Sequence, residues 1–106
     1  MISSETIQEA VRLLAEQSAV QRVILFGSYA RGTAHEDSDL DFLVLETGPI
    51  SRRTEMVRLR AVLRPLFVPV DVMVADVEQF EAWKDQPGTA LFEAARHGQV
   101  VYERAG

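Results

Sequence analysis

The segment from Gly27 to Val44, which reads GSYARGTAHEDSDLDFLV, places the tightest limit on what this chain can fold into. A short apolar run, 23–26, precedes it, and a second, 40–45, overlaps its end. Runs of this length, rich in β-branched and aliphatic residues, are typical of buried strands rather than of helices. Gly27 ends the first run, and Gly32 follows a possible helical turn at 29–31. The segment therefore predicts a strand, a tight turn, a polar loop over 33–38 and a second strand.

Helical spacing and turn residues predict the rest of the chain. Ser3 and Ser4 are candidate N-caps for a first helix, and Pro65 is placed to end or kink a second. The further elements predicted are a helix over 51–64, a strand over 68–74, helices over 77–83 and 89–97, and a last strand over 100–102. With 106 residues, the chain has enough material for one core. We therefore expect a single domain over 1–106, α/β (α+β), with a small mixed β-sheet and flanking helices.

Composition limits the function classes. The chain has no cysteine, so any metal site is expected to use oxygen ligands, which favours magnesium or manganese. The net charge of -5 argues against broad affinity for nucleic acid, which is not expected as a direct substrate. No apolar run approaches the length needed to cross a bilayer and no signal-peptide pattern follows Met1, so the expected location is the cytoplasm and no membrane association is expected.

The positive charges are unevenly distributed. Five of the eleven basic residues lie in one segment: Arg52, Arg53, Arg58, Arg60 and Arg64. A solvated helix face is one interpretation of this segment. A surface that docks a partner or faces a triphosphate is the other.

Two alternating carboxylates open the second predicted strand. Asp39 and Asp41 should project to the same side, roughly 7 Å apart along the chain, while Leu40 and Phe42 point into the core. Carboxylates shared by two metal ions about 3.5–4 Å apart are a feature of phosphoryl-transfer sites. A strand that enters from a loop with its acids in water is the alternative that spacing alone leaves open.

The Gly27-Ser28 pair follows a predicted strand and precedes a helical turn. Glycine lets the backbone approach a ligand closely, and free amides at a helix start favour phosphate. The Ser28 hydroxyl can bond a phosphate oxygen. A Gly-Ser pair is uninformative by itself; its position shortly before Asp-x-Asp makes it a candidate phosphate cradle.

Asp71 interrupts a run of valines in the third predicted strand. A carboxylate is costly to bury there unless it is paired or binds a cation. One interpretation is a third metal-facing carboxylate, which could also accept the proton of an attacking hydroxyl. The other is an edge strand with Asp71 facing solvent.

Together these residues resemble the nucleotidyltransferase superfamily that includes DNA polymerase beta, and specifically its minimal nucleotidyltransferase family. The family pattern is Gly-Ser-x-x-x-Gly, a short loop, Asp-x-Asp and a third acid on a later strand. The extended form, GSxARGxAxxxSDxDxxV, also matches. The matching positions here are Gly27, Ser28, Ala30, Arg31, Gly32, Ala34, Ser38, Asp39, Asp41 and Asp71.

The resemblance implies the chemistry of the site. Asp39 and Asp41 would hold two magnesium ions, and Asp71 would complete the catalytic metal site and help deprotonate the acceptor. Gly27 and Ser28 would bind the β- and γ-phosphates of ATP. Arg31 would stabilise them or pack the loop, and Ser38 is grouped with these nucleotide-binding positions. A hydroxyl would attack the α-phosphorus of ATP and release pyrophosphate.

The resemblance also implies a partner. Relatives that modify antibiotics or extend RNA carry further domains for the acceptor, whereas minimal members commonly act beside a small all-helical HEPN ribonuclease, as antitoxins that transfer AMP to a toxin tyrosine. A hetero-oligomer with that HEPN toxin is therefore one expected arrangement. Two alternatives stay open: a non-catalytic binding module that neutralises a partner by occlusion, and nucleotidyl transfer to a small molecule with a second subunit.

Overall fold

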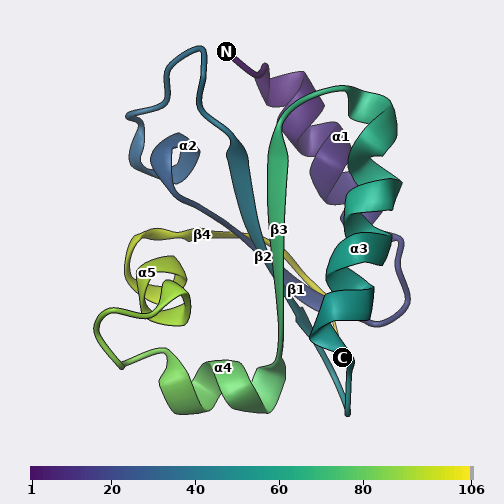
Figure 1. The fold of residues 1–106 in the computed structure, drawn as a ribbon, viewed down its shortest axis with the longest axis vertical. Helices are drawn as coiled ribbons and strands as arrows, with labels where there is room; N and C mark the ends of the chain where they lie inside the picture. The colour runs from purple at the N-terminus through teal and green to yellow at the C-terminus, as the bar shows by residue number, and fades with distance from the viewer. Residues whose placement is uncertain (106) are drawn as a thin grey trace.

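The computed structural model describes residues 1–105 and consists of one four-stranded sheet with helices on both faces (Figure 1). The elements in chain order are α1 (Ser4–Ala15), β1 (Val20–Phe26), α2 (Ser28–Arg31), β2 (Leu40–Glu46), α3 (Arg52–Leu63), the 3₁₀ turn η1 (Arg64–Leu66), β3 (Val70–Asp76), α4 (Val77–Trp83), α5 (Ala90–His97) and β4 (Gln99–Glu103). The predicted fold class, a small mixed sheet with flanking helices, is confirmed.

The sheet has the order β3-β2-β1-β4. β1 is antiparallel to both β2 and β4, whereas β2 and β3 are parallel. The crossover from β2 to β3 runs through α3, as a parallel connection requires. β1 therefore stops at the end of the sheet where β2 and β3 start. β3 is the outermost strand on one side of the sheet.

Alternation along β2 divides the core into two layers. Leu40, Phe42 and Val44 pack with α1 and α3 on one face. Leu43 and Leu45 pack with α4 and α5 on the other. Figure 1 shows α1 beside α3 on one side of the sheet and α4 and α5 on the other. Tyr29 and Ala30 of the short α2 pack against the core on the α1–α3 side.

The helices begin at side chains that suit N-caps. Ser3, Ser51, Asp76 and Thr89 each accept a hydrogen bond from a backbone amide in the first turn of α1, α3, α4 and α5 respectively. Such caps satisfy amides that have no partner inside the helix. The cap at Ser3 agrees with the sequence prediction.

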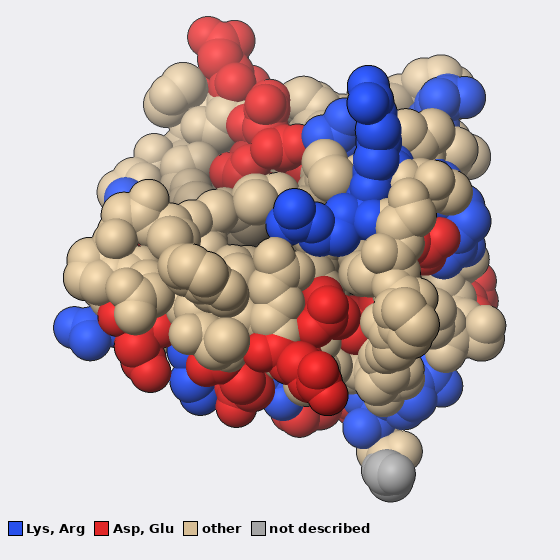
Figure 2. Space-filling view, turned by 60° about the horizontal axis from the view of Figure 1, so that its bottom comes forward, with Lys and Arg blue, Asp and Glu red and all other residues tan. Residues whose placement is uncertain are grey.

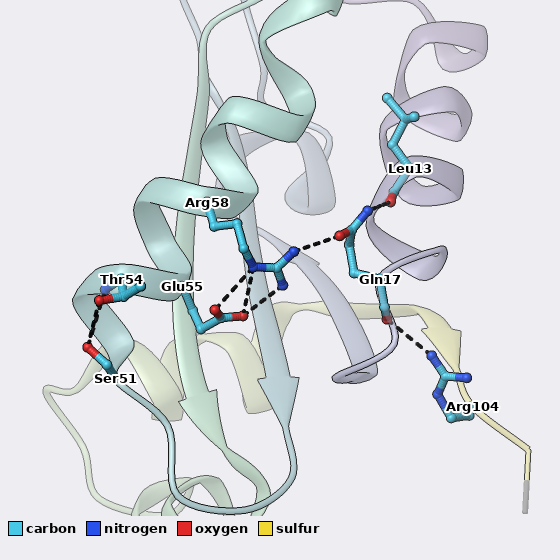
Figure 3. A network of polar contacts seen from close by, with 7 residues as sticks. All are labelled: Leu13, Gln17, Ser51, Thr54, Glu55, Arg58 and Arg104. Atoms are coloured by element: carbon cyan, nitrogen blue, oxygen red, sulfur yellow. Dashed lines mark hydrogen bonds and ion pairs between the residues drawn. The ribbon is translucent and has the colours of Figure 1, made fainter.

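A polar network joins α3 to the end of α1 and to the chain after β4 (Figure 3). Arg58 donates to Glu55 at 2.7 Å and to the Gln17 side chain at 2.6 Å. Arg104 donates to the Gln17 backbone carbonyl at 3.2 Å. Arg58 is thus held by contacts within the fold.

Two predicted strands had bounds that were wrong by two residues or more. The third strand runs from Val70 to Asp76 rather than over 68–74, because Phe67 adopts a left-handed conformation with φ 55°. The Pro69 carbonyl accepts the Leu40 amide at 3.0 Å, and pairing with β2 starts one residue later. The first strand begins at Val20, three residues earlier than predicted, since pairing with β2 reaches that far.

Candidate active site

The predicted site residues meet at the end of the sheet where β1 stops and β2 and β3 start. Phe26, the last residue of β1, is opposite Asp41, and Asp41 is opposite Asp71 in the parallel pair. Strand alternation places Asp41 with Leu43, and Asp71 with Met73, on the face that carries α4 and α5. The parallel pairing of β2 with β3 therefore places Asp41 next to Asp71, thirty positions later in the sequence.

Gly27 makes room for Asp41. Its φ of 75° lies in the left-handed region, and a Cβ built there would overlap the Asp41 carboxylate at Oδ2. The Gly27 carbonyl also accepts the Arg31 amide at 3.1 Å, which closes the single turn of α2. Gly27, in the predicted phosphate cradle, therefore lies directly against the Asp41 carboxylate, and only glycine fits there.

Negative charge is concentrated around Asp41. Burial raises the pKa of the Asp41 carboxyl above its ordinary value, and the neighbouring Asp71 and Asp39 carboxylates raise it further. Asp39 is exposed and lies immediately before β2, where the bond between the Leu40 amide and the Pro69 carbonyl fixes the chain. The three predicted acids therefore repel one another electrostatically.

Ser38 shapes the loop that leads to these acids. It is largely buried; its hydroxyl accepts the His35 amide at 2.9 Å, and its own amide donates to the His35 carbonyl at 3.0 Å. These bonds close the loop directly before Asp39. A contact between Ser38 and a nucleotide stays a prediction.

Arg60 reaches the site from the opposite face of the sheet. Its guanidinium donates to Asp71 Oδ1 at 2.7 Å, although α3 packs on the other face from the acids. This is possible because β3 is the edge strand. Asp71 is thus both half-exposed, at 48%, and paired with a cation.

Arg31 is held by a residue that the sequence did not single out. Its guanidinium forms an ion pair with Glu93 of α5, which joins α2 to the helical layer beside it. Glu93 lies in an ordinary amphipathic helix, and nothing in its spacing signals the contact. Arg60, by contrast, belongs to the basic segment for which a triphosphate-facing role was one interpretation.

The donor set suits a hard divalent cation. All three acids supply oxygen, which magnesium and manganese prefer, and the mutual repulsion at Asp41 is what a bound cation would relieve. Within residues 1–105, no three His, Cys, Asp or Glu side chains are already gathered as a metal-binding group.

Comparison with known proteins agrees with this geometry. Residues 6–97 match the family described as nucleotidyltransferase domain. The chain belongs to the nucleotidyltransferase domain family. The match spans every element from α1 to α5, so the predicted superfamily resemblance is confirmed, and the enzyme class of this chain is nucleotidyltransferase. A search of curated proteins found no match.

Solved structures share the fold of this nucleotidyltransferase. A chain from a toxin–antitoxin complex with AMP-PNP aligns with TM-score 0.63 and 20% identity, over 97% of this chain and 75% of its own. A chain from a complex of tri-AMPylated Shewanella oneidensis HEPN toxin with MNT antitoxin gives 0.62 and 17%, over 97% and 74%. A Sulfolobus solfataricus protein described as a nucleotidyltransferase gives 0.60 and 19%, over 97% and 91%. At these identities, the likeness shows the fold.

Proposed function

We propose that this nucleotidyltransferase transfers AMP from ATP to a hydroxyl of a protein partner, a tyrosine of a HEPN ribonuclease toxin, and thereby acts as an antitoxin. The observation that carries the proposal is the in-register pair Asp41 and Asp71 beside Gly27, with Asp39 next to them. The structural relatives that contain AMP-PNP or an AMPylated HEPN toxin support the choice of nucleotide and acceptor.

In the proposed reaction, the acceptor oxygen attacks the α-phosphorus of ATP, the bond to the β-phosphate breaks, and pyrophosphate leaves. Asp39, Asp41 and Asp71 would hold magnesium, which when bound neutralises triphosphate charge and orients the phosphates. The free backbone amides after Gly27 and the Ser28 hydroxyl would bind the β- and γ-phosphates. Asp71 Oδ2, which lies outside the bond to Arg60, would accept the hydroxyl proton.

Arg31 would stabilise the phosphates from α2. Its ion pair with Glu93 of α5 supports the alternative role, in which Arg31 packs the loop. Positioning and fixed charge would thus supply most of the rate enhancement.

ATP labelled at either the α- or the γ-phosphate tests the reaction class. The chain, magnesium and the HEPN protein that co-purifies with it are incubated with each label in turn. We expect label on the HEPN protein from α-labelled ATP only, and none with Asp41→Asn. Asp37→Asn, an exposed acid of the loop that precedes β2, is the matched control and should retain transfer. Label from γ-labelled ATP, or equal transfer by Asp41→Asn, would refute the proposal.

A further inference from the structure

A groove between α3 and β3 combines apolar side chains with arginines. Its floor is formed by Met56 and Val57 of α3 and by Met73 and Val74 of β3. Arg52, Arg53 and Arg60 line its rim. A second hollow, lined by Arg60, Arg64, Val68 and Val70 among others, continues it toward the start of β3. We call these two hollows together the α3–β3 groove.

The basic rim follows from helical spacing. At 3.6 residues per turn, Arg52, Arg53 and Arg60 fall with Met56 and Val57 within about 140° of the α3 circumference. Arg52, Arg53 and Arg64 form no ion pair within residues 1–105. Figure 2 shows positive side chains gathered on the side where α3 lies, and acidic ones mostly elsewhere on that face. The groove is therefore a local positive surface on a chain of net charge -5.

Apolar exposure at the groove points to a macromolecular occupant. Val57 is 63% exposed, and Phe67, next to Val68 of the second hollow, is 91% exposed. Phe67 also has a φ of 55°, in a region that bulky residues rarely adopt. Phe67 therefore adds backbone strain to the fold and almost no packing energy, which is typical of a residue that binds another molecule.

The groove is continuous with the candidate active site. Arg60 lines both hollows and donates to Asp71 Oδ1 at 2.7 Å. A polypeptide that lies along the outer edge of β3 therefore reaches the catalytic acids without crossing the rest of the protein. The open edge of β3 also offers backbone donors and acceptors to such a chain.

We propose that the α3–β3 groove is the docking surface for the acceptor protein, which contributes a segment of apolar side chains flanked by Asp or Glu. Charge complementarity selects the acidic flanks, and Met56, Val57 and Phe67 receive the apolar side chains. The apolar floor disfavours a nucleic-acid backbone, which needs a surface that is basic throughout. The inference rests on the proposed function, because it names where that acceptor binds.

Binding of the co-purifying HEPN protein, measured by calorimetry without nucleotide, tests the groove. The variant is R52E/R53E, two exposed arginines outside the proposed catalytic set. The matched control, K84E/R96E, makes the same change in net charge at a hollow beside α4 and α5. We expect R52E/R53E to weaken binding on the order of tenfold or more, and K84E/R96E to bind like the unmodified chain. Val57→Asp should weaken binding as well, because it places charge in the apolar floor.

Three results would overturn the groove assignment. The first is equal binding by R52E/R53E and K84E/R96E, or no binding by the unmodified chain. The second is self-association of this chain, measured by analytical ultracentrifugation, that R52E/R53E abolishes. The third is binding of a single-stranded RNA oligonucleotide that depends on the same arginines.

The same samples separate this inference from the proposed function. AMP transfer by the unmodified chain together with unchanged binding by R52E/R53E refutes only the groove. Binding that depends on Arg52 and Arg53, without any AMP transfer by the unmodified chain, supports the groove and refutes the proposed function. Circular dichroism of each variant verifies that it is folded.

Discussion

A buried carboxyl group at the end of β2 is expected to lower the stability of the protein as the pH rises. Glu46 is completely shielded from solvent, and neither of its carboxylate oxygens has a hydrogen-bond partner within residues 1–105. Burial, and then the neighbouring Glu55 carboxyl group, raise the pKa of Glu46 from 4.5 to about 7. A protonated Glu46 can donate a hydrogen bond to Glu55, which Arg58 keeps ionised by lowering its pKa.

The sign of the effect follows from proton binding. Between pH 4.5 and about 7, folded Glu46 binds a proton that the unfolded chain has lost, so the free energy of unfolding falls as the pH rises through this window. At about 1.4 kcal/mol per pH unit, the loss from this group amounts to about 3 kcal/mol and is nearly complete at pH 8.5. Glu46→Gln stays neutral and can still donate to Glu55, so it avoids this loss.

Urea unfolding followed by circular dichroism at pH 5 and pH 8.5 measures the difference. We expect the free energy of unfolding of Glu46→Gln, relative to the unmodified chain, to be about 2.5 kcal/mol more favourable at pH 8.5 than at pH 5. Glu36→Gln, at an exposed loop position, is the matched control and should show the same small difference at both values. A constant difference for Glu46→Gln at the two pH values would refute the reasoning.

Three further substitutions test other parts of the structure. Gly27→Ala should lower the free energy of unfolding in urea by roughly 1–3 kcal/mol and abolish binding of a fluorescent ATP analogue. The reason is that the alanine Cβ would overlap Asp41 and that φ at this position is positive. Unchanged binding would contradict the close contact between Gly27 and Asp41. Phe67→Gly should stabilise the chain by about 1 kcal/mol in the same unfolding assay, since it relieves the left-handed backbone and removes few contacts; a loss of stability would mean that Phe67 packs. Glu93→Gln should change stability by less than about 1 kcal/mol, as its ion pair with Arg31 is partly exposed; a larger loss would assign the pair a structural role.

Local signals in the sequence were sufficient for most elements of this fold. Short β-branched runs predicted the strands, and Ser3 and Gly27 marked boundaries that the structure confirms. The start of β3 was wrong because it depends on the backbone of Phe67 and on pairing with β2. Both are tertiary effects that a run of valines does not reveal.

The candidate site was predictable only in part. The Gly-Ser and Asp-x-Asp motifs identified the residues, but their meeting with Asp71 depends on parallel register. Arg60 reaches Asp71 around an edge strand, and the predicted strand over 40–45 stopped just before Glu46. From the sequence, a carboxylate after an apolar run indicates a loop, whereas the structure buries Glu46 at the end of β2.

Intact mass spectrometry of a HEPN protein co-expressed with this chain, as the proposed acceptor, tests the central claim most directly. The protein is weighed after incubation with this chain, ATP and magnesium, beside a sample with Asp41→Asn. We expect a gain of whole AMP units with the unmodified chain and none with the variant. A stable complex whose mass does not change would contradict protein adenylylation and favour neutralisation by occlusion.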